Sequence, residues 1–101
     1  NTAFGYTALY SNTSAIDNVA VGLNALTANT TGTDNVAVGA RALDSNTVGY
    51  NNSAIGDNAL GVNVDGSNNT ALGSDALAAM VDANYSTAIG ADTLQNATGG
   101  A

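Results

Sequence analysis

The stretch Asn35-Val36-Ala37-Val38-Gly39 decides the fold, because it is one copy of a pattern that recurs along the whole chain. The pattern is N-x-A-Φ-G, where Φ is a large apolar residue, and each copy begins 17 residues after the one before. The six copies begin at Asn1, Asn18, Asn35, Asn52, Asn69 and Ser86, with Ser replacing Asn in the last. Because the interval never changes by an insertion or a deletion, it predicts that each repeat forms one turn of a stacked coil.

Four columns of the aligned repeats have a fixed character. The fourth and ninth positions hold large apolar residues, and we expect them to form the structural core. These residues are Phe4, Val21, Val38, Ile55, Leu72 and Ile89, then Leu9, Leu26, Leu43, Leu60, Leu77 and Leu94. The third and fifth positions hold only Ala and Gly, which permit tight packing of one chain against another. These residues are Ala3, Gly5, Ala20, Gly22, Ala37, Gly39, Ala54, Gly56, Ala71, Gly73, Ala88 and Gly90.

The spacing inside a repeat favours short strands over a helix. Apolar residues do not recur at the spacing of an amphipathic helix, whereas residues 2–5 alternate as the residues of a strand do. A second short strand is expected around Ala8 and Leu9, and the Asn and Gly at the twelfth and fifteenth positions are expected in turns. The chain is therefore predicted to be all-β, a parallel β-solenoid of about six turns. Residues 1–101 form its single domain, which we expect to be a fragment of a longer chain.

Stacking places like residues above like. With about 4.8 Å between neighbouring strands, six turns predict a rod about 29 Å long. The twelfth column, Asn12, Asn29, Asn46 and Asn63, is expected to form a ladder of side-chain amides. Met80 interrupts this column, and Asn96 comes one place early.

Both faces of the predicted strand are uncharged at the third, fourth and fifth positions. A strand that is small or apolar on both faces is usually buried on both. One face would line the interior of the coil and the other would meet another molecule. The sequence leaves open which face is the interior, and a cyclic trimer is one closed way to cover the other.

Composition excludes several classes of function. Eight Asp residues and a single cation, Arg41, give a net charge of −7. Nucleic-acid binding and attachment to an anionic membrane both need clustered Lys and Arg. The chain has no His and no Cys, and nothing else present would activate a Ser. We therefore expect no enzyme activity, no catalytic or cofactor-binding residue and no cofactor.

Two binding chemistries deserve a test against the sequence. Calcium-binding solenoids need a Gly-Gly-x-Gly-x-Asp pattern, which does not occur, so Asp17 and Asp34 are expected to be solvated turn residues and no metal site is predicted. An ice-binding face needs unbroken rows of Thr. The second-position row, with Thr2 and Thr70, is broken by Val19, and the thirteenth-position row is broken as well.

The repeat resembles a known family. The segments Asn1-Thr2-Ala3-Phe4-Gly5-Tyr6 and Ala8-Leu9-Tyr10-Ser11-Asn12-Thr13 are similar to the head repeats of trimeric autotransporter adhesins, and to related repeats of bacterial and phage tail fibres. The resemblance covers the whole chain. It implies a left-handed parallel β-roll, three chains side by side as a homotrimer, and a place on a cell surface or a virion fibre. It also implies binding to a host surface or matrix.

The sequence thus predicts a structural repeat module of an extracellular fibre or adhesin, which mediates surface attachment or acts as a rigid spacer. Its variable sixth, seventh, tenth and fourteenth positions would carry any recognition. The alternative is a ligand-binding β-solenoid for ice or surface glycans.

Overall fold

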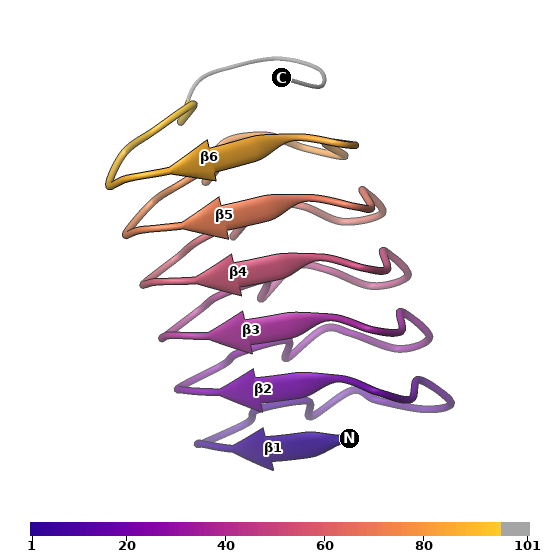
Figure 1. Ribbon diagram of the computed structural model, residues 1–101. Coiled ribbons are helices and arrows are strands. Elements are labelled where there is room, and N and C mark those ends of the chain that lie inside the picture. Colours follow the sequence, from indigo (N-terminus) through magenta and orange to yellow (C-terminus); the bar gives the residue numbers. More distant parts are fainter. Residues whose placement is uncertain (96–101) are drawn as a thin grey trace.

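The computed structural model describes residues 1–95 and shows an all-β solenoid of about five turns. Asn96 and the rest of the sixth repeat lie outside the described residues. Each repeat contributes one strand of three residues to a parallel sheet with the order β1-β2-β3-β4-β5-β6 (Figure 1). The strands are β1 Thr2–Phe4, β2 Val19–Val21, β3 Val36–Val38, β4 Ser53–Ile55, β5 Thr70–Leu72 and β6 Thr87–Ile89.

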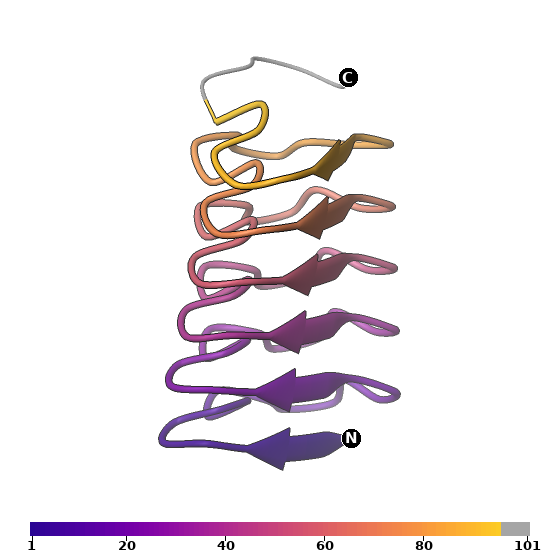
Figure 2. The same ribbon diagram turned by 60° about the vertical axis from the view of Figure 1, so that its left-hand side comes forward.

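The register confirms that one repeat is one turn. Every strand pairs with the next at equal repeat positions, as in Ala37 with Ala54 and Val38 with Ile55. Figure 2 shows the turns stacked one above the next along the axis of the rod. The Cα trace spans 30 × 19 × 15 Å, close to the length predicted from the spacing of six strands.

The corner after each strand is closed by the glycine at the fifth position. Gly39 has a φ of +133°, in a region that other residues rarely adopt. A Cβ on Gly39 would lie 2.5 Å from the carbonyl oxygen of Gly56 in the next turn. We expected the glycines of this column to pack tightly against another chain. That expectation is wrong, because the first five glycines of the column each lie against the next turn of the same chain.

The second strand expected around Ala8 and Leu9 is wrong. This segment forms consecutive turns, in which the Ala8 N–H donates to the Gly5 oxygen at 3.2 Å and the Tyr10 N–H to the Thr7 oxygen at 3.2 Å. Thr7 and Leu9 have φ values of 56° and 52°. A strand needs negative φ at every residue, so left-handed residues at alternate positions reverse the chain. The same pattern recurs in every repeat.

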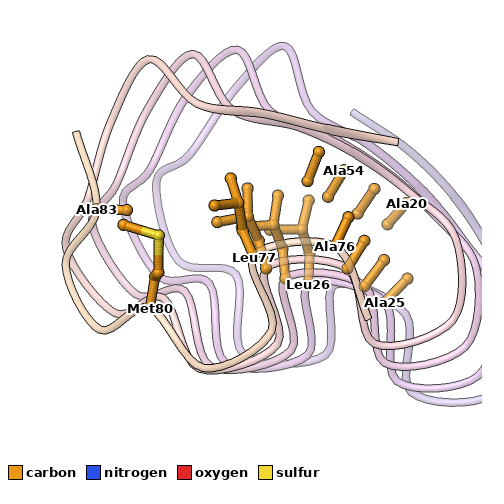
Figure 3. Packing of buried hydrophobic residues seen from close by; sticks show 14 of the residues in the cluster. Ala20, Ala25, Leu26, Ala54, Ala76, Leu77, Met80 and Ala83 are labelled. Atoms are coloured by element: carbon orange, nitrogen blue, oxygen red, sulfur yellow. The ribbon is translucent and has the colours of Figure 1, made fainter. Parts of the chain in front are cut away.

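The core lies between the sheet and these turns. The Ala side chains of the strands face the Ala and Leu columns of the eighth and ninth positions, and Met80 and Ala83 fill the opposite end of the interior (Figure 3). Leu26, Leu43 and their equivalents in the next two repeats are completely buried, which confirms the ninth column as core. Leu94, in the last described turn, is 37% exposed. Among the third-position Ala residues, only Ala3 in the first turn is exposed.

The fourth column does not belong to the core of the single chain, contrary to expectation. Val21 and Val38 are half-buried, and the other four residues of this column are exposed; they are Phe4, Ile55, Leu72 and Ile89. Alternation along the strand points the Ala at the third position inward and the large residue outward. The Leu column already fills the narrow interior, so only Ala fits opposite it.

Candidate functional site

The outer side of the sheet is a continuous uncharged surface, which we call the outer face. It consists of the second- and fourth-position residues of all six strands: Thr2, Phe4, Val19, Val21, Val36, Val38, Ser53, Ile55, Thr70, Leu72, Thr87 and Ile89. The largest side chains stand well out of the chain, with Phe4 78% and Ile89 67% exposed. Contiguous exposed apolar patches often mark interaction sites, whereas single exposed apolar residues are common on any protein surface.

A buried ladder of Asn at the first position keeps the sheet in register. The Asn35 N–H donates to the Asn18 Oδ1 at 2.9 Å, and the Asn35 Oδ1 accepts the Asn52 N–H at 3.0 Å. The Asn35 Nδ2 donates to the Gly49 oxygen at 2.8 Å, which ties the start of a turn to its end. Each of these amides therefore closes its own turn and also joins it to the next. Asn at the start of five repeats is the sequence signal for this role, which spacing and hydrophobicity alone do not predict.

A second ladder, at the twelfth position, confirms the expected stack of amides for Asn29, Asn46 and Asn63, whereas the Asn12 Oδ1 is buried without a partner and lies outside it. The Asn46 Nδ2 donates to the Asn29 Oδ1 at 2.9 Å, and the Asn63 Nδ2 to the Asn46 Oδ1 at 3.1 Å. The Asn46 Nδ2 also donates to the Gly49 oxygen at 3.0 Å. A Cβ at Gly49 would collide with the Asn46 Oδ1. In the second to fourth turns Asn at the twelfth position occurs with Gly at the fifteenth, whereas the first turn pairs Asn12 with Ala15.

This second ladder ends at Met80. The Asn63 Oδ1 is buried and has no hydrogen-bond partner, because a thioether replaces the next amide. Ala83 occupies the fifteenth position in the same turn. Met80 and Ala83 are both buried and belong to the same apolar cluster at this end of the interior.

Charged side chains lie away from the outer face. All eight Asp residues and Arg41 fall at the sixth, seventh, tenth, fourteenth and seventeenth positions, in the turns. Arg41 forms an exposed ion pair with Asp57, with 2.8 Å between Nη2 and Oδ2. Partial burial raises the pKa of Asp44, and the hydrogen bond from Ser45 opposes this shift. The outer face is thus an uncharged strip on an acidic rod.

The predicted recognition positions carry few features of a small-molecule site. Tyr6 and Tyr10 are exposed at the sixth and tenth positions of the first turn. Among residues 1–95 there is no pocket and no group of three acidic residues placed to hold a metal ion. Asp17 and Asp34 lie in turns with φ values of 60° and 59°.

The two Thr rows have different environments. The second-position hydroxyls lie on the outer face, whereas the thirteenth-position hydroxyls bond to neighbouring turns. The Thr13 Oγ1 donates to the Thr30 oxygen at 3.0 Å, and the Thr30 Oγ1 to the Thr47 oxygen at 3.1 Å. The thirteenth row is therefore part of the framework between turns.

Comparisons with protein-family models, with curated proteins and with solved structures gave no match to this chain. The resemblance to adhesin heads and tail fibres therefore stays a prediction. The described residues include no helix long and apolar enough to cross a membrane.

Proposed function

We propose that the chain is a structural repeat module of an extracellular fibre or adhesin, and that it associates with copies of itself through the outer face. The observation that carries this proposal is the uncharged outer face itself, which runs along all six strands while every charge lies in the turns. Charge depletion at the centre of a surface, with a charged rim, is typical of protein interfaces.

The geometry of the outer face favours a closed ring of parallel chains. Three copies related by a common axis can all direct the outer face inward, and a cyclic trimer then leaves no open face for further growth. This arrangement agrees with the homotrimer and left-handed β-roll that the resemblance implies. A surface-bound fibre or virion fibre would then use the rod as a rigid spacer or attachment module.

The size of the outer face limits how strongly six repeats associate. Six strands about 4.8 Å apart, each about 10 Å long, give the outer face an area of roughly 300 Å² on each chain. Stable protein interfaces bury about 800 Å² on each partner. Because each added turn extends the face by about 4.8 Å, association would strengthen with the number of repeats.

Mass measurement in solution tests the proposal. We expect concentration-dependent association of the chain, and stronger association of a chain with the repeats duplicated. A Leu72→Asp variant places a charge on the outer face, and we expect it to remain folded and monomeric. The matched control, Ala79→Asp, adds the same charge at an exposed position away from the face. A duplicated chain that stays monomeric at high micromolar concentration would sink the proposal.

A ligand-binding solenoid remains the second candidate, because Thr2, Ser53, Thr70 and Thr87 place hydroxyls on a flat, regularly spaced face. Val19 and Val36 interrupt this row. Thermal hysteresis that is lost in Thr70→Leu would favour ice binding over self-association.

A further inference from the structure

The join between the fourth and fifth turns differs on the two sides of the rod. On the sheet side it is the same as every other join. The Gly73 N–H donates to the Ile55 oxygen at 2.8 Å, and the Asn69 N–H donates to the Asn52 Oδ1 at 3.1 Å. On the opposite side, two of the rows of hydrogen bonds that join the earlier turns are missing after Asn63.

Two rows of hydrogen bonds end at this join. The amide ladder stops at the Asn63 Oδ1, which faces Met80 and has no partner. The backbone row of the thirteenth position runs from Thr30 to Thr47 at 2.9 Å and from Thr47 to Val64 at 2.8 Å. Within residues 1–95 the row does not continue, because the Val64 N–H forms no bond to the Val81 oxygen. Val64 also lacks the hydroxyl through which Thr13 and Thr30 bond to the next turn.

Side-chain oxygens of the fifth turn accept two amides of the fourth turn, one in an exposed bond and one in a partly buried bond. The Asp65 N–H donates to the Asp82 Oδ1 at 3.0 Å, and the Ser67 N–H to the Asn84 Oδ1 at 2.9 Å. Asp82 and Asn84 are both exposed, so water competes for these acceptors. The carboxylates of Asp65 and Asp82 also lie on successive turns, and their like charges repel one another.

We propose that residues 80–85, here called the return strap, open from the rod as a local unit while β4, β5 and β6 stay paired. In the closed state the Asn63 oxygen is buried without a donor, whereas opening lets water reach it. The buried Met80 side chain and the 2.6 Å bond that the Ala83 oxygen accepts from the Asn69 Nδ2 hold the strap closed. Local opening of a weakly bonded segment below the global unfolding transition is common in proteins. Opening would move Val81 and Tyr85, which are exposed on the outside of the strap.

Amide hydrogen exchange measured residue by residue tests the proposal. The seventeenth-position amides form a matched column, in which the Asn51 N–H donates to the Thr33 oxygen at 3.1 Å and the Tyr85 N–H to the Ser67 oxygen at 3.2 Å. After correction for intrinsic rates, we expect Tyr85 to exchange at least about tenfold faster than Asn51, since an orphaned buried acceptor shifts an equilibrium by about that factor. The Gly90 N–H, which bonds the Leu72 oxygen at 2.7 Å in the sheet, should stay slow.

The position of Gly90 separates a local opening from fraying of the chain end. Gly90 lies later in the sequence than Tyr85, so fraying from the end would make it exchange at least as fast. Fast exchange of both residues, or exchange of Tyr85 as slow as that of Asn51, would overturn the proposal.

The double variant Met80→Asn with Ala83→Gly tests the cause. It restores the Asn and Gly pair of the earlier turns and supplies a donor for the Asn63 oxygen. We expect Tyr85 exchange to slow about tenfold while Gly90 is unchanged. Unchanged Tyr85 exchange in a folded double variant would contradict the assignment. The comparison of Tyr85, Asn51 and Gly90 in the natural chain decides the proposal even if this variant does not fold.

Discussion

Replacing Asn35 by Ala should destabilise the rod far more than replacing an exposed Asn with similar bonds. Asn35 is completely buried, and its side chain joins two turns. The Ala variant leaves the Asn52 N–H without an acceptor in a buried site, and leaves the Gly49 oxygen with only the Asn46 amide. An orphaned buried donor costs about 1–3 kcal/mol and a lost hydrogen bond costs about 1 kcal/mol more. We therefore expect the free energy of unfolding to fall by about 2–4 kcal/mol.

Asn84→Ala is the matched control. The Asn84 side chain also accepts one backbone N–H, from Ser67 at 2.9 Å, and donates to one backbone oxygen, of Asp82 at 3.0 Å. Asn84 is exposed, so water replaces both bonds and the loss should stay below about 1 kcal/mol. Urea unfolding followed by circular dichroism measures both values.

The comparison has a clear contrary outcome. Equal losses in Asn35→Ala and Asn84→Ala would show that the buried ladder does not hold the turns together. Asn35→Ser, which copies the natural Ser86, should fall between the two, because a hydroxyl keeps an acceptor but is too short for both bonds. If the Ala variant does not fold, the Ser variant carries the same test.

Three further variants test other parts of the fold. Gly39→Ala should cost more than about 3 kcal/mol or prevent folding, because its Cβ meets the Gly56 oxygen at 2.5 Å and its φ is +133°; a thermal midpoint close to that of the natural chain would contradict this. Leu60→Ala should cost about 2–5 kcal/mol, and Leu94→Ala clearly less because Leu94 is partly exposed; equal losses in urea unfolding would refute the assigned core. Asp44→Asn should stabilise the chain at neutral pH, because burial raises the pKa of Asp44 and penalises its charged form. That gain should disappear as the pH falls through the raised pKa towards 3.8, where the natural carboxyl is also neutral; a gain that persists at lower pH would exclude this cause.

The period and the first strand could be predicted from the sequence alone, because both depend only on spacing. A fixed interval between copies of N-x-A-Φ-G permits no other stacking than one turn per repeat, and alternation around Ala37 marks the strand. The turns at Thr7 and Leu9 could not be predicted in the same way. Leu rarely adopts a left-handed backbone, so nothing in its identity signals a φ of 52°.

The choice between the two faces also needed the structure. Val38 and Ala37 are both apolar, so hydrophobicity does not decide which one points inward. The interior holds one Leu per turn and has room only for Ala opposite. Side-chain volume therefore decides which face of the strand points inward. The sequence signal for this choice is that the first five repeats combine Ala at the third and eighth positions with Leu at the ninth. The candidate association surface follows from that result, since it is the side of the strand that the interior excludes.

The 17-residue turn has a mechanical consequence. Hydrogen bonds between turns run along the axis of the rod, so tension applied to its two ends acts on all joins in series and the weakest join opens first. A released turn extends to at most about 60 Å and gives up a rise of about 4.8 Å, for a gain of roughly 50 Å. Because all turns have the same length, pulling should lengthen the molecule in equal steps. A rod built in this way should extend in steps under tension, and each step takes up mechanical work that would otherwise act on whatever the two ends are attached to.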